Sequence, residues 1–218
     1  MISLLCPSRK RPKELRRFVD SVYSTADNLP EIVCYVDQDD DSYDFFGWGV
    51  KFVRGPRIVL SDTWNKCAVK ASSEILMMTA DDCVFKTPGW DAMIEKAFEN
   101  CSDKILMVHG DDGVNGDRFG VFPTIHRRWV DNVGYFCPPC FVGDYPDCWL
   151  VDVANALGRR KFLPYVTEHL HWVHGKAPMD DTYRERLAKE KLNDPTRLYE
   201  SMKADRDRDI ALLRAVIG

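Results

Sequence analysis

The feature that most constrains the fold of this chain is an apolar segment that ends in two acids. Residues 75–78 read Ile-Leu-Met-Met, and Thr-Ala then leads to Asp81 and Asp82. A short apolar run without polar alternation is typical of a strand buried on both faces, as in a parallel sheet covered by helices. Side chains just past the carboxyl end of such a strand lie where open α/β sheets bind their ligands. Because adjacent carboxylates repel each other, we expect this pair to bind a divalent cation.

The rest of the chain alternates between strand-like and helix-like segments. Further strands are predicted over residues 2–6, 31–36, 50–53, 105–108 and 166–173. Helices are predicted over residues 12–23, 62–71, 88–98 and 146–157, and in the charged tail from 178 onward. This alternation predicts an α/β fold, with a mostly parallel central sheet flanked by helices. Residues 110–146 are rich in glycine, proline and aromatic residues, and we expect them to fold over the sheet.

Composition places few limits on function. The chain has 218 residues, of which 45% are hydrophobic and 29% charged, which suits a single globular domain. No run approaches the roughly 20 apolar residues of a membrane span. The N-terminus lacks the features of a signal peptide, so a cytoplasmic protein is expected. The net charge of −4 disfavours a dedicated nucleic-acid binder, although basic clusters occur at residues 9–17, 126–128 and 159–161.

The eight cysteines are expected to be buried thiols rather than disulfides, because no even spacing links them. Cys137 and Cys140 have zinc-knuckle spacing, but no second pair completes a site. The chain also lacks a P-loop, a dinucleotide-binding glycine motif, a nucleophile elbow and a zinc-protease helix. These absences exclude most nucleotide hydrolases, dehydrogenases and serine hydrolases, and leave sugar-nucleotide chemistry open.

Charged residues follow the first two predicted strands. Arg9 and Arg11 come after the first strand, where guanidinium groups suit a diphosphate, although they equally suit a basic helix start on the surface. Asp37 and Asp39 come after the second strand. One of them would accept a hydrogen bond from a base ring N–H or from a ribose hydroxyl; the alternative is a solvated turn.

Two further groups are candidates for chemistry. His169 and His171 share a face if their segment is a strand, and paired imidazoles suit a metal or a phosphate. Asp147 lies in the first turn of a predicted helix, where an acid is either catalytic or simply favoured by the helix dipole. The acid pair at residues 111–112 competes with Asp81 and Asp82, but its flanking glycines equally suit a turn.

Taken in order, these segments resemble nucleotide-sugar glycosyltransferases of the GT-A type, in particular the inverting family-2-like enzymes. The resemblance rests on residues 6–9 (Cys-Pro-Ser-Arg), 35–40, 64–65 (Trp-Asn), 75–82, 88–91, 147 and 168–171. It implies a GT-A (Rossmann-like) domain over residues 1–175. Residues 1–109 would form its nucleotide-sugar half and residues 110–175 its acceptor half. Residues 176–218 would be a helical C-terminal extension.

The resemblance also implies roles for individual residues. Those expected to bind the nucleotide-sugar are Pro7, Ser8, Arg9, Arg11, Asp37, Asp39, Asn65, Thr79, Ala80 and Asp81. Those expected to bind Mn²⁺ or Mg²⁺ are Asp81, Asp82, His169 and His171. Asp147 would be the general base, with Asp144 as the alternative. One position departs from the family pattern: the usual Asp-x-Asp signature has Thr79 in place of its first acid, so metal dependence is less strongly implied.

The acceptor is left open by the sequence. Small glycosyltransferases of this appearance resemble phage enzymes that modify hydroxymethylated DNA bases, which would place the protein in a host cytoplasm. The basic clusters suit such an acceptor, and a saccharide is the other candidate. A catalytically inactive nucleotide-sugar binding module is the alternative function. A nucleotidyltransferase is disfavoured because the first loop contains no glycine.

Overall fold

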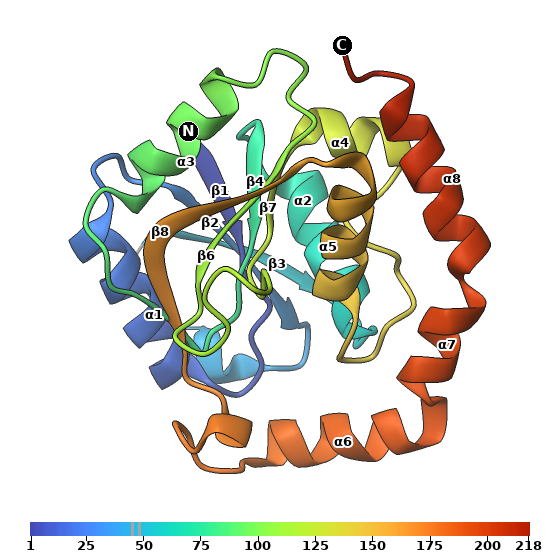
Figure 1. Ribbon diagram of the computed structural model, residues 1–218. Coiled ribbons are helices and arrows are strands. Elements are labelled where there is room, and N and C mark those ends of the chain that lie inside the picture. The colour runs from blue at the N-terminus through green and yellow to red at the C-terminus, as the bar shows by residue number, and fades with distance from the viewer. Residues whose placement is uncertain (45, 48) are drawn as a thin grey trace.

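The computed structural model describes residues 1–44, 46–47 and 49–218, and within them eight strands form one sheet (Figure 1). The strands are β1 Ile2–Leu5, β2 Glu31–Asp37, β3 Val50–Gly55, β4 Ile75–Met78, β5 Cys83–Phe85, β6 Met107–Asp111, β7 Thr124–His126 and β8 Arg160–His169. Their order in the sheet is β3-β2-β1-β4-β7-β6-β8-β5. The four strands at one end of this order, β3, β2, β1 and β4, are parallel to one another, which confirms the predicted α/β class.

Helices cover both faces of this sheet. They are α1 Pro12–Thr25, α2 Leu60–Lys70, α3 Trp90–Glu99, α4 Arg127–Val133, α5 Pro146–Leu157, α6 Asp181–Asn193, α7 Pro195–Ser201 and α8 Lys203–Arg214, with short 3₁₀ turns at Asp41–Tyr43 and Trp172–His174. α1 and α3 pack on one face, and α2, α4, α5 and α8 pack on the other (Figure 1). The fold is therefore a three-layer arrangement of helices, sheet and helices.

The apolar run of β4 is explained by these two layers. Ile75 and Met77 belong to the core beneath α1 and α3, whereas Leu76 and Met78 belong to the core on the opposite face. Successive side chains of a strand point to opposite faces, so a strand with a core on each side needs apolar residues at every position. The prediction of a doubly buried strand before the acid pair is confirmed.

The order of the parallel strands creates a crevice at one end of the sheet. β1 pairs with β2 on one side and with β4 on the other, so the direction in which strands are added reverses between β1 and β4. Leu5 pairs with Met78, and the loops that leave these two strands therefore diverge from neighbouring points. Ligands of open α/β sheets bind at such a switch point, outside the carboxyl ends of the strands.

The second half of the sheet differs from the prediction. β5 and β7 were not predicted, and both pair antiparallel with their neighbours. Each has three residues, too few for a periodic pattern to appear in the sequence. The strand predicted over residues 166–173 is β8, which begins at Arg160 and ends at His169. The chain leaves the strand there, because a 3₁₀ turn forms at Trp172–His174.

The C-terminal tail is helical, as predicted, and its last helix belongs to the core. Leu198, Met202, Ile210 and Ile217 pack against the core that underlies α2 and α5, and Leu213 is fully buried in it. The apolar residues of the tail therefore form one stripe that packs on the domain.

Neighbouring leucines of α8 offer a matched test of this packing. We expect Leu213→Ala to lower the free energy of unfolding by about 2–4 kcal/mol, because it leaves a cavity in a closed core. Leu212 is 41% exposed, so Leu212→Ala is expected to change stability by less than about 0.5 kcal/mol. Urea denaturation of both variants measures the difference. Equal losses would mean that α8 does not pack on the domain in solution.

Candidate functional site

A pocket of about 320 Å³ lies at the switch point, between the carboxyl ends of the parallel strands and helix α6. Twelve of the predicted site residues line it: Pro7, Ser8, Arg9, Arg11, Asp37, Ala80, Asp81, Asp82, Asp144, Asp147, His169 and His171. These residues come from loops that are distant in sequence. The pocket therefore brings residues that follow the parallel strands together with residues near the start of α5 and the end of β8.

Asp81 is bound by protein groups on both of its oxygens. Ser8 Oγ donates to Oδ2 at 2.6 Å, and Arg11 Nη1 lies 3.3 Å from Oδ1. Tyr43 completes the chain, since its hydroxyl lies 2.6 Å from Ser8 Oγ and accepts from the Arg11 backbone N–H at 3.0 Å. Burial raises the pKa of Asp81 well above its usual range, although Arg11 opposes the change. This carboxylate links the loop after β1 to the loop after β4.

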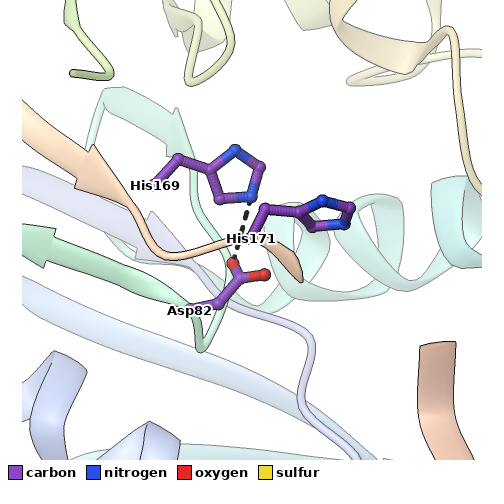
Figure 2. Close-up of side chains that lie close together, drawn as sticks. All are labelled: Asp82, His169 and His171. Carbon is purple, nitrogen blue, oxygen red and sulfur yellow. Dashed lines mark ion pairs between the residues drawn. The ribbon is translucent and has the colours of Figure 1, made fainter. Parts of the chain in front are cut away.

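Asp82 lies beside two imidazoles, as Figure 2 shows. Its Oδ1 is 3.4 Å from His169 Nε2, and one ligand atom from each of Asp82, His169 and His171 falls within 4.8 Å of the others. Oδ2 accepts a hydrogen bond from the Tyr183 hydroxyl at 2.7 Å. Burial alone would raise the pKa of Asp82, but the hydrogen bonds and charge of these neighbours outweigh it and lower the pKa to about 2. The carboxylate is therefore ionised.

The Asp82 cluster has the properties of a cation site. Asp82 Oδ1 is buried, and among the residues that the structure describes its one polar neighbour at short range is His169 Nε2, at 3.4 Å, which is too far for a good hydrogen bond. A buried ionised oxygen with so weak a partner is costly, and a bound cation would compensate for it. One carboxylate and two imidazoles form a mixed oxygen and nitrogen donor set, which suits Mn²⁺ better than Mg²⁺. The residues present thus fit a divalent transition metal.

Strand pairing brings these three residues together. Cys83, which follows Asp82, opens β5 and pairs with His169 at the end of β8. The Leu170 N–H then donates to the Asp82 carbonyl at 2.8 Å. Because His169 and His171 flank this contact, both imidazoles lie near the Asp82 carboxylate.

Asp147 and Asp144 have different environments. Asp147 lies in the first turn of α5, just after Pro146, and desolvation raises its pKa to about 6 although the Cys148 N–H donates to it at 2.8 Å. Asp144 is exposed and lies 2.5 Å from Arg186 Nη2. A base with a pKa near the working pH is efficient, and Asp147 meets this condition, whereas the Asp144 carboxylate is engaged by Arg186.

Three predicted residues do not line the pocket. Asp39 is exposed. The Asn65 side chain accepts from the Phe136 N–H at 2.8 Å and donates to the Cys137 carbonyl at 2.8 Å, so it holds a loop in place. The Thr79 hydroxyl is fully buried and donates to the Leu5 carbonyl at 2.9 Å. Thr79 therefore joins β4 to β1 below the pocket and presents no group to a ribose.

Several pocket residues were not predicted. Arg57 follows β3 at the same edge of the sheet, so the strand-end argument applied to β3 would have found it. Tyr183 and Arg186 belong to α6, which lies across the end of the sheet (Figure 1). No sequence signal marks these two, because they lie in a charged segment whose pattern indicates only a helix. Among the described helices, none is long and apolar enough to cross a membrane.

No family model and no curated protein matches the chain by sequence. Solved structures do match its fold. A mannosyltransferase from Pyrobaculum calidifontis, PcManGT, in complex with GDP-Man and Mn²⁺, matches with a TM-score of 0.59 and 14% identity, over 97% of this chain and 69% of that one. S. aureus TarS matches with a TM-score of 0.57 and 13% identity, over 78% of this chain and 37% of TarS.

A UDP complex of TarS residues 1–349 gives a similar result, with a TM-score of 0.55 and 15% identity over 75% of this chain and 59% of that one. This chain thus spans between about a third and about two thirds of the length of these proteins. Identities this low establish the fold alone. The parallel β3-β2-β1-β4 half, the pocket at its switch point and these structural matches together show that the chain has the GT-A fold.

Proposed function

We propose that this protein is a Mn²⁺-dependent glycosyltransferase, which moves a sugar from a nucleoside-diphosphate donor to an acceptor hydroxyl. The observation that carries the proposal is the ionised, buried Asp82 between His169 and His171, in a pocket that also contains arginines. The GT-A fold supports it, since PcManGT has the same fold and was solved with GDP-Man and Mn²⁺.

The donor would lie with its diphosphate between the arginines and the Asp82 cluster. Arg9 and Arg11 come from the loop after β1 and line the pocket. Asp37 lines it from the end of β2, 3.0 Å from Arg9 Nε, in position to accept from a base or ribose. A divalent cation held by Asp82, His169 and His171 would stabilise the negative charge that develops on the leaving diphosphate.

Asp147 is the proposed general base. It lines the pocket at the start of α5, in the part of the chain that we expect to bind the acceptor. Its carboxylate would take the proton of the acceptor hydroxyl as that oxygen attacks the anomeric carbon, and the bond from this carbon to the diphosphate oxygen would break. With a pKa of about 6, Asp147 is ionised at neutral pH and basic enough to accept a proton.

We propose a saccharide rather than DNA as the acceptor, because arginines of two of the basic clusters bind groups of the protein itself. Arg127 donates to backbone carbonyls at the end of α2 and in the loop that follows it. Arg159 lies 2.8 Å from the Asp103 carboxylate, and Arg160 donates to the Arg118 carbonyl at 3.0 Å. Arginines held in this way have few donors left for phosphates along a DNA backbone.

A donor screen tests the proposal. UDP- and GDP-sugars are added with Mn²⁺, with Mg²⁺ or with EDTA, and both the melting temperature and the release of UDP or GDP are recorded. We expect one donor to raise the melting temperature with Mn²⁺, less with Mg²⁺ and not with EDTA, because a ligand that binds only the folded state stabilises it. Nucleotide release with a saccharide acceptor confirms transfer. Binding without release indicates the inactive binding module instead.

A further inference from the structure

Three arginines of the pocket are paired with carboxylates from the C-terminal segment. Arg11 makes a bidentate pair with Asp180, at 2.7 Å from Nε to Oδ2 and 2.8 Å from Nη2 to Oδ1. Arg9 and Arg57 both bind Glu185 on α6, each through a different carboxylate oxygen. Arg9 follows β1 and Arg57 follows β3, so Glu185 bridges loops from two different strands.

These carboxylates occupy positions that suit a phosphate. Guanidinium groups bind carboxylates and phosphates with the same planar, forked geometry, so either anion can satisfy them. Partial burial would raise the pKa of Glu185, but hydrogen bonds from Arg57 and Arg9 outweigh it and lower the pKa to about 2. Glu185 is thus fully ionised at neutral pH and competes as an anion.

Helix α6 is attached to the domain mainly through polar groups. Of its thirteen residues, Tyr183 and Glu190 alone are buried, and the helix has no continuous apolar stripe. Tyr183 stacks on the Arg11 guanidinium, which lies 4.0 Å from its ring centroid, and its hydroxyl donates to Asp82. A helix held by ion pairs has little hydrophobic burial to lose when it moves, so another anion can displace it at low cost.

Resting on the proposed function, we infer that Arg9, Arg11 and Arg57 bind the donor diphosphate, and that Asp180 and Glu185 occupy these arginines until the donor displaces them. The inference assigns Arg57 to the donor site. It also makes α6 an internal competitor: the free energy needed to separate α6 from the arginines lowers the apparent affinity for the donor. Donor binding and release of α6 are then one coupled event.

The first test measures pyrophosphate binding by isothermal titration calorimetry. Pyrophosphate carries the diphosphate charge without a base or sugar. We expect Glu185→Gln to tighten the dissociation constant about tenfold relative to wild type, because the competing charge is removed while the side-chain volume is kept. Asp181→Asn is the matched control: it removes the same charge from the same helix, but Asp181 is exposed and pairs only with Arg184 among the described residues. Unchanged or weaker binding by Glu185→Gln overturns the inference.

The second test follows α6 itself by hydrogen–deuterium exchange. Competition predicts that amides of residues 181–193 exchange faster when pyrophosphate binds, because the helix is released from the arginines. Slower exchange would mean that α6 closes over the ligand, which contradicts the inference.

The two proposals can fail separately. If a nucleotide-sugar binds and is turned over while Glu185→Gln has no effect on pyrophosphate, the proposed function stands and the competition is wrong. If Glu185→Gln tightens pyrophosphate binding but no nucleotide-sugar binds or is turned over, the arginines form an anion site and the glycosyltransferase assignment is wrong.

Discussion

Asp82→Asn is expected to abolish Mn²⁺ binding and to reduce sugar transfer by about 10²–10³-fold. The substitution keeps the size of the side chain and an oxygen that can accept from Tyr183, but it removes the charge between the two imidazoles. Loss of the cation removes several kcal/mol of transition-state stabilisation, and each 1.36 kcal/mol corresponds to about a factor of ten in rate. Electron paramagnetic resonance of Mn²⁺ measures binding, and nucleotide release measures transfer.

Asp81→Asn is the matched control. The oxygens of Asp81 are bound by Ser8 and Arg11, and Asp81 is not part of the three-residue cluster, so this variant is expected to bind Mn²⁺ as wild type does. The resemblance implies that Asp81 is also a metal ligand. Loss of Mn²⁺ binding in Asp81→Asn, with retention in Asp82→Asn, would support Asp81 and contradict the role of Asp82. Circular dichroism of both variants checks that each is folded.

Asp147→Asn is expected to lower the turnover rate by about 10²–10⁴-fold, which is the usual contribution of a general base. In the wild-type protein the base is active only when it is ionised. Transfer should therefore rise with pH up to the Asp147 pKa of about 6 and level off above it. The residual activity of the variant should lack this rise. A rise that persists in Asp147→Asn would assign the titration to another group.

The same substitution is expected to stabilise the fold at alkaline pH. The pKa of Asp147 is raised from an ordinary value of 3.8 to about 6, so the folded protein holds the proton more tightly than the unfolded chain does. The stabilisation that Asp147 contributes is complete below its pKa in the unfolded chain, 3.8, because the carboxyl group is then protonated in both states. This contribution is lost as the pH rises through the folded pKa of about 6. At pH 8, Asp147→Asn should therefore raise the free energy of unfolding by about 1–3 kcal/mol. Urea denaturation at pH 8 measures it, and a loss of stability there would indicate a structural role.

Much of the parallel half of the fold was predictable from the sequence, because the segments that form β1, β2 and β4 are mostly apolar and each is followed by polar residues. β4 with Asp81 and Asp82 is the clearest case. The antiparallel strands were not predictable, since β5 and β7 are short and their pairing is set by distant segments. α5 was predicted with its observed bounds, because Pro146 suits its first turn and Gly158 ends it in a left-handed conformation.

The sequence predicts which strand ends contribute residues to the site, but it does not predict which side chains contact one another there. Position along the chain indicated that Asp81 and Asp82 share a site, but only the tertiary contacts distinguish the one bound by Ser8 from the one facing the imidazoles. The involvement of α6 was unpredictable for a related reason. Its charges are typical of an exposed helix, whereas Tyr183 lines the pocket and Glu185 forms ion pairs with two of the pocket arginines.

The pairing of β5 with β8 has a consequence for the order of folding. Side chains of a strand alternate between faces, so a slip of one residue in the Cys83–His169 register would turn His169 away from Asp82. The paired residues are far apart along the chain, and non-local pairs of this kind cost the most loop entropy and form slowly. The cluster of Asp82, His169 and His171 is complete only after they have met. A cation bound there would stabilise only the chain in which β5 and β8 have paired, and its affinity would report whether they have paired in the correct register.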